Sequence, residues 1–122
     1  MGRKKRILVV EDDYIHRKIL RDALESRGYL VEDASNGFSA LKKLEHTSYD
    51  FMIADNLMPG MQGLELIDEI SLKRINVKSF LVSGKLTREI SRQAKEKGVV
   101  ECYDKPFPLK LMMEKLKEIL NS

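Results

Sequence analysis

Residues 50–55 (DFMIAD) run directly into residues 56–63 (NLMPGMQG), so an apolar segment ends in the carboxylate of Asp55 and the chain then turns. A short apolar run bounded by turn signals is typical of a strand buried on both faces, and the proline and two glycines that follow prevent a direct continuation into a helix. In open α/β sheets, ligands bind at the carboxyl ends of the strands. Asp55 is therefore the first candidate for a functional residue.

The composition indicates one domain. With 122 residues, 43% of them hydrophobic, the chain is long enough for one core and too short for two. The single cysteine, Cys102, excludes a disulfide within the chain and a cysteine metal cluster, and it favours a reducing, cytoplasmic setting. The apolar run at residues 7–10 is too short for a signal peptide or a membrane span.

The net charge of +3 comes from one short segment. Residues 3–6 (RKKR) hold four of the 22 basic residues, which leaves 18 to face 19 acidic residues. We therefore expect a solvated basic lead-in at residues 1–6 and a nearly neutral domain at residues 7–122, with no direct nucleic-acid or membrane partner.

Strand signals alternate along the chain with apolar residues at helical spacing. The segments expected to form strands are residues 7–10, 29–34, 50–55, 78–83 and 99–103. The first helix is expected to stop at Gly28, the fourth to be capped by Thr87 and to stop at Gly98, and the last to begin with Pro108. Five strands alternating with five helices predict a doubly wound, flavodoxin-like α/β fold, with a five-stranded parallel sheet in the order 2-1-3-4-5.

This strand order predicts a polar cluster at one edge of the sheet. Strands one and three lie side by side, so Glu11 and Asp12 are expected next to Asp55, and strands four and five deliver Ser83 and Lys105 to the same edge. Three carboxylates held close together repel one another unless a cation is present. A hard divalent ion with few protein ligands fits best, which indicates Mg²⁺, with Mn²⁺ as a substitute.

The same residues suit phosphoryl transfer, which needs positioning and neutralisation of charge on the phosphoryl oxygens. Lys105 supplies a point charge suited to phosphate, and Ser83 supplies a hydroxyl that can donate to a phosphoryl oxygen. An aspartate carboxylate can itself be the nucleophile. Asp55 is the best candidate, because Glu11 and Asp12 are paired for metal binding.

Five short motifs in this order resemble the receiver domain of two-component response regulators, in particular the single-domain type related to chemotaxis regulators. The motifs are residues 9–12 (VVED), Asp55 itself, residues 58–60 (MPG) with Gly63, residues 83–84 (SG) and residues 105–107 (KPF). Each motif is weak by itself, but together they extend over essentially the whole chain.

The resemblance implies that Asp55 is phosphorylated by a phosphohistidine of a sensor kinase or phosphotransfer protein, with Mg²⁺ required. It implies that Glu11, Asp12, Asp55 and the backbone carbonyl of Leu57 bind the metal. A receiver domain of this kind is not an enzyme on other substrates: it catalyses only its own phosphorylation and dephosphorylation.

The resemblance also assigns roles near the fourth and fifth strands. Ser83 matches the switch hydroxyl and Lys105 the invariant lysine, and the bond between Lys105 and Pro106 is expected to be cis. A downstream partner is expected on the face formed by the fourth helix, the fifth strand and the fifth helix.

Two positions depart from, or vary within, the family pattern. Cys102 occupies the position of the switch aromatic, three residues before Lys105, and the neighbouring Tyr103 is expected to point to the other face of the sheet. The usual coupling through an aromatic ring is therefore in question. Lys85, two residues after Ser83, occupies a position that tunes how fast the acyl phosphate hydrolyses, and its cationic side chain is expected to cover the phosphoryl group.

Three other functions compete with this interpretation. A pseudo-receiver would keep the fold as an interaction module that is regulated without phosphate, and Cys102 favours it slightly. A phosphatase with an aspartate nucleophile usually has a second aspartate two residues later, where this chain has Leu57. A flavin carrier needs a hydroxyl- and glycine-rich loop after the first strand, where this chain has acids.

The remaining polar candidates near the first two helices have structural interpretations. Asp13 is expected to cap the first helix rather than to bind metal. His16 and His46 lie in charged, helical surroundings and are expected to be surface residues without a specific partner.

Overall fold

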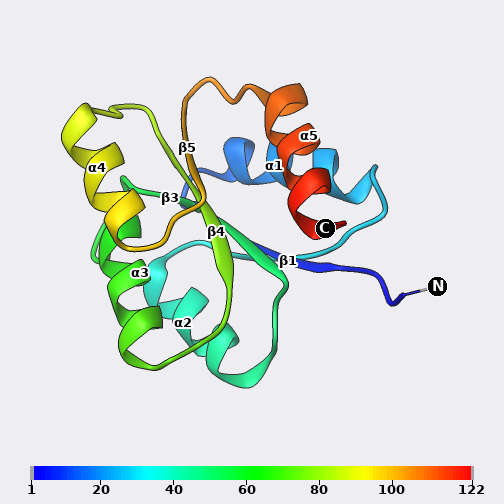
Figure 1. Ribbon diagram of the computed structural model, residues 1–122, viewed down its shortest axis with the longest axis horizontal. Coiled ribbons are helices and arrows are strands. Elements are labelled where there is room, and N and C mark those ends of the chain that lie inside the picture. Colours follow the sequence, from blue (N-terminus) through cyan, green and yellow to red (C-terminus); the bar gives the residue numbers. More distant parts are fainter. Residues whose placement is uncertain (1, 122) are drawn as a thin grey trace.

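Five short strands form one parallel sheet, which lies between two layers of helices in the computed structural model of residues 2–121 (Figure 1). The strands are β1 (Arg6–Val10), β2 (Leu30–Ala34), β3 (Phe51–Asp55), β4 (Lys78–Ser83) and β5 (Glu101–Asp104). The helices are α1 (Tyr14–Glu25), α2 (Gly37–His46), α3 (Gly63–Leu72), α4 (Arg88–Glu96) and α5 (Leu109–Leu120). The strand order β2-β1-β3-β4-β5 confirms the predicted topology.

The central strands are buried on both faces, as their apolar runs predict. In β1, Ile7 and Val9 belong to the core beneath α1 and α5, whereas Leu8 and Val10 belong to the core beneath α2, α3 and α4. Figure 1 shows these two helical layers on opposite sides of the sheet. Because successive side chains of a strand point to opposite faces, a continuous apolar run supplies both cores.

Two arginines near the start of the chain, Arg3 and Arg6, form ion pairs with acidic residues of the domain. The Arg3 guanidinium donates two hydrogen bonds of 2.8 Å to the Asp50 carboxylate, and Arg6, which belongs to β1, donates to Glu32 at 2.6 Å. The basic lead-in is therefore bonded to the domain through Arg3 and Arg6. The predicted domain end at residue 122 lies outside the described residues.

The first three strands each begin one residue away from their predicted starts, and the fifth strand and the last helix differ from the prediction for structural reasons. The fifth strand begins at Glu101 rather than Val99, because the Val99 N–H bonds to the Ala94 carbonyl and completes the turn after α4, while the buried Val99 side chain packs in the core. Pro108 precedes the last helix instead of beginning it, and its carbonyl accepts the helical hydrogen bond from Met112. The apolar character of Val99 serves packing and not strand pairing, a distinction that a sequence pattern does not make.

The loop after β3 depends on Gly63. A Cβ atom at Gly63 would lie 2.6 Å from the Asp55 carbonyl oxygen and 2.9 Å from the Asn56 Cα atom. Only a residue without a side chain lets α3 start this close to the end of β3. The Asn56 side-chain oxygen also accepts a 3.0 Å hydrogen bond from the Leu64 N–H, which links the start of the loop after Asp55 to the first turn of α3.

Candidate functional site

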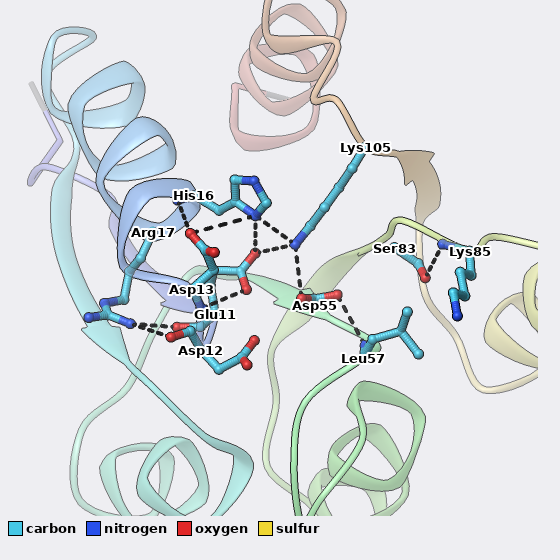
Figure 2. Close-up of polar contacts among 10 residues, drawn as sticks. All are labelled: Glu11, Asp12, Asp13, His16, Arg17, Asp55, Leu57, Ser83, Lys85 and Lys105. Carbon is cyan, nitrogen blue, oxygen red and sulfur yellow. Dashed lines mark hydrogen bonds and ion pairs between the residues drawn. The ribbon is translucent and has the colours of Figure 1, made fainter.

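Charged and hydroxyl side chains converge where the strands end (Figure 2). Glu11 follows β1, Asp55 ends β3, Ser83 ends β4 and Lys105 follows β5. The peptide bond between Lys105 and Pro106 is cis, as expected from the resemblance. The structure thus places all four groups at the carboxyl edge of the sheet, as the predicted strand order requires.

Lys105 connects the two acids at the centre of the site. Its ammonium nitrogen donates to Glu11 Oε1 at 2.7 Å and to Asp55 Oδ2 at 3.0 Å. Burial alone would lower the pKa of Lys105, but the hydrogen bonds to Glu11 and Asp55 outweigh it and raise that pKa. Lys105 is therefore a permanent cation between two carboxylates that solvent barely reaches.

Ionisation of Glu11 is costly at this site. Its side chain is fully buried, and this burial raises its pKa to about 7, with a further increase from the neighbouring Asp55 carboxylate. The Lys105 ammonium opposes the shift without cancelling it. One lysine thus leaves the buried acids short of positive charge near neutral pH.

The arrangement of the acids fits a hard divalent cation. Carboxylate oxygens of Glu11, Asp12 and Asp55 all lie within 4.8 Å of one another. Asp12 is exposed and Glu11 is buried, so an ion between them would keep a side open to water. Oxygen ligands, a shortage of positive charge and room for water are the conditions that Mg²⁺ prefers.

The groups near β4 form a separate pair. Ser83 is buried, and its Oγ atom accepts a 3.1 Å hydrogen bond from the Lys85 N–H. Within residues 2–121, neither Ser83 nor the Lys85 side chain has a hydrogen bond or ion pair to Asp55. Asp55 Oδ1 instead accepts from the Leu57 N–H at 3.1 Å. The structure therefore joins Glu11, Asp55 and Lys105 directly and leaves Ser83 and Lys85 beside them.

Cys102 and Tyr103 face opposite layers of helices. Cys102 pairs in register with Leu81 and packs half-buried against the core on the α4 side, where burial raises the pKa of its thiol. Tyr103 lies in the opposite core, with its ring 5.1 Å from that of Phe80 in an edge-to-face contact. The expectation that Tyr103 does not replace an aromatic at position 102 is confirmed.

His16 is the site residue that the sequence interpretation missed. Its Nδ1 atom lies 3.0 Å from the Lys105 ammonium nitrogen, and its ring packs edge-on against Phe107 with centroids 5.5 Å apart. The expectation of a surface histidine without a partner is therefore wrong for His16, although His46 is exposed as expected. The available signal was its place in the first turn of α1, directly above the acids that follow β1.

The turn between β1 and α1 is held by its own polar groups. Asp13 caps α1 by accepting from the His16 N–H at 2.9 Å, which lowers the pKa of Asp13, and this confirms its predicted structural role. The Arg17 guanidinium donates to the Glu11 carbonyl oxygen at 2.8 Å. These bonds fix the start of α1, and with it His16, relative to the acids.

A family model described as the response regulator receiver domain matches residues 7–117. Chemotaxis protein CheY-3 of Vibrio cholerae is 32% identical, over 98% of this chain and 94% of that protein. The sensor histidine kinase RcsC of Salmonella typhimurium is also 32% identical, over 90% of this chain but only 12% of that protein.

Solved structures agree with the sequence comparisons. A CheY-like receiver domain protein from Methanospirillum hungatei superposes with a TM-score of 0.91 and 31% identity, covering 98% of this chain and 95% of the other. Within residues 2–121, no helix combines the length and the apolar character that crossing a membrane requires.

Proposed function

The chain belongs to the response regulator receiver domain family, and from this membership we propose that it is a switch in which Asp55 accepts a phosphoryl group from a phosphohistidine. Receiver domains of this family act in two-component signalling, where they interact with histidine kinases or phosphotransfer proteins and with downstream targets. We assign the receiver domain to residues 7–122 and the lead-in to residues 1–6, which the family match over residues 7–117 supports.

The observation that carries the proposal is the contact of one buried aspartate with one lysine beside a cluster of acids. Asp55 is 3% exposed, accepts from Lys105 at 3.0 Å and lies within 4.8 Å of oxygens of Glu11 and Asp12. These groups supply the nucleophile, the cation and the metal ligands that phosphoryl transfer requires.

The chemistry follows from the positions of these groups. A carboxylate oxygen of Asp55 attacks phosphorus while the bond from phosphorus to the donor nitrogen breaks, and the donor imidazole leaves. Lys105 orients the nucleophile and then donates to a phosphoryl oxygen. Glu11, Asp12, Asp55 and the Leu57 carbonyl would hold Mg²⁺ or Mn²⁺, which neutralises charge on the phosphoryl oxygens.

The switch acts through the end of β4. The Ser83 hydroxyl accepts from the Lys85 N–H, and its own proton remains available for a phosphoryl oxygen on Asp55. Movement of this loop reaches α4, which anchors to the core through the buried Ala94 and the half-buried Ile90. By analogy with the family, we place the downstream partner on the face of α4, β5 and α5, with Cys102 in the coupling position.

The proposal predicts a covalent adduct at Asp55. Incubation with Mg²⁺ and acetyl phosphate should add one phosphoryl group to the wild type, as measured by intact mass. The adduct should be labile to base, absent with chelator and absent from Asp55→Ala. Asp104→Ala, which removes an exposed aspartate at the end of β5, is the matched control and should accept the group normally.

An adduct that persists in Asp55→Ala would refute the assignment of the acceptor. If the wild type accepts nothing from acetyl phosphate or from a phosphorylated histidine protein, the chain is a pseudo-receiver. That alternative is supported by Cys102, whose thiol lacks the aromatic ring of the usual switch.

A further inference from the structure

We propose that His16 is a positioning residue for Lys105, holding its ammonium in the site by accepting one of its three N–H bonds. The proposal rests on the function proposed above and deepens it, because it assigns a role in phosphorylation to a residue outside the predicted site. The observation is the 3.0 Å approach of His16 Nδ1 to the Lys105 ammonium nitrogen (Figure 2).

The direction of this hydrogen bond follows from the chemistry of the two groups. A lysine ammonium has three donors and no acceptor, so the Nδ1 atom of His16 must be the acceptor and must carry no proton. The same Nδ1 lies 3.7 Å from Glu11 Oε1 and 3.9 Å from Asp13 Oδ1, which are ion-pair distances only for a protonated ring. A proton on Nδ1 would point at a cation 3.0 Å away, so the geometry makes Nδ1 the acceptor in this contact.

His16 completes the set of acceptors around Lys105. The ammonium donates to Glu11 at 2.7 Å, to Asp55 at 3.0 Å and to His16 at 3.0 Å, so each N–H has one acceptor. The three acceptors come from the end of β1, the end of β3 and the first turn of α1. Three acceptors fix both the position and the orientation of the ammonium. With two acceptors alone, the ammonium could still rotate about the line that joins them.

Phosphorylation changes one of the other two acceptors. When Asp55 becomes an acyl phosphate, the negative charge lies on the phosphoryl oxygens, so the N–H that Lys105 donated to the Asp55 carboxylate must turn to a phosphoryl oxygen. Glu11 is at the same time needed as a metal ligand. His16 is the acceptor that neither change removes, and it keeps the ammonium directed at the phosphoryl oxygens.

The surroundings hold the His16 ring in place for this role. The ring stands edge-on to Phe107, two residues after Lys105, and the His16 backbone N–H is bound to Asp13 at 2.9 Å. The contact with Phe107 also suggests a competing explanation, in which His16 serves only as packing. The two explanations predict opposite results for two substitutions.

The test compares His16→Asn with His16→Phe. Asparagine places an acceptor oxygen on the same Cγ position but has no ring, whereas phenylalanine keeps the ring and has no acceptor. We expect the rate of Asp55 phosphorylation by acetyl phosphate to fall about tenfold in His16→Phe, the loss expected for one hydrogen bond to a charged group, and to recover most of its value in His16→Asn. His46→Phe, at the exposed histidine of α2, is the matched control and should match the wild type.

A second readout does not depend on phosphorylation. The ¹⁵N-attached protons of the Lys105 ammonium should give a slowly exchanging NMR signal in the wild type and in His16→Asn, and this signal should be lost in His16→Phe. Phosphorylation of His16→Phe at the wild-type rate would overturn the proposal. If His16→Asn were then phosphorylated slowly, the result would favour the packing explanation. A wild type that accepts no phosphoryl group would instead overturn the proposed function, and the kinetic role of His16 with it.

Discussion

The Lys105 ammonium is the one cation in contact with the buried carboxylates of Glu11 and Asp55 within residues 2–121. Burial raises the pKa of Glu11 to about 7 from an ordinary value of 4.5, and the Lys105 ammonium offsets only part of this increase. The folded protein therefore holds the Glu11 proton more tightly than the unfolded chain does. Its stability contribution is fully present below about pH 4.5 and is lost as the pH rises through about 7.

At the residue scale, Glu11→Gln should remove this dependence. With chelator present, the variant should exceed the wild type in free energy of unfolding by about 3 kcal/mol at pH 8, and the difference should shrink toward pH 4.5. Urea unfolding across this pH range measures it. Addition of Mg²⁺ should stabilise the wild type more than the variant, and an advantage of Glu11→Gln that does not change with pH would contradict the account of Glu11.

At the scale of elements, α3 can begin beside β3 only because position 63 has no side chain. The Cβ atom of Gly63→Ala would meet the Asp55 carbonyl at 2.6 Å and a Leu81 methyl at 2.8 Å, so the backbone of the site must shift. The shift acts on the segment that carries Asp55 and Asn56. Both the packing of α3 and the geometry of the acceptor depend on this contact.

Gly63→Ala should lower the free energy of unfolding by about 1 to 3 kcal/mol, the usual cost of overpacking, as measured by denaturant titration. It should also slow phosphorylation of Asp55. Gly84→Ala is the matched control, because a Cβ atom there has nothing within 4 Å, and its stability should stay within about 0.5 kcal/mol of the wild type. Equal effects of the two substitutions would show that the close approach at Gly63 does not constrain the loop.

At the scale of the whole molecule, aromatic rings connect three strands on the α1 and α5 side of the sheet. The ring centroid of Phe80 in β4 lies 4.7 Å from that of Phe51 in β3 and 5.1 Å from that of Tyr103 in β5, and both contacts are edge to face. These contacts join strands from different parts of the sequence. They make the sheet one cooperative unit with the site at its edge.

Phe80→Ala should therefore lower the free energy of unfolding by about 3 to 5 kcal/mol. The variant should still unfold in a single transition, with the same midpoint by fluorescence and by circular dichroism. Leu72→Ala, at a side chain that is 76% exposed, should change stability by less than about 0.5 kcal/mol. Separate transitions in Phe80→Ala would instead mean that β5 and α5 unfold apart from the rest.

The sequence by itself determined the order of the elements, the parallel sheet and the edge at which the polar groups meet. Apolar runs such as residues 7–10 are local signals, and alternation of strands with helices leaves few topologies. Asp55 and Lys105 could be placed at one edge because a parallel sheet brings the carboxyl ends of its strands together. The cap at Thr87 and the turn at Gly98 are equally local, since each depends on bonds within a few residues.

Only the tertiary structure decided which atoms touch. Lys105 is 94 residues from Glu11 and 89 from His16 along the chain, so their contacts depend on how α1 packs against the loop after β5. No spacing rule links these positions, and the residues around His16 in the sequence give it the pattern of a surface residue. The start of β5 was likewise set by packing, because Val99 is buried at the end of α4 instead of pairing in the sheet. Local signals fix backbone elements, whereas side-chain contacts between distant segments are determined by the way the whole core packs.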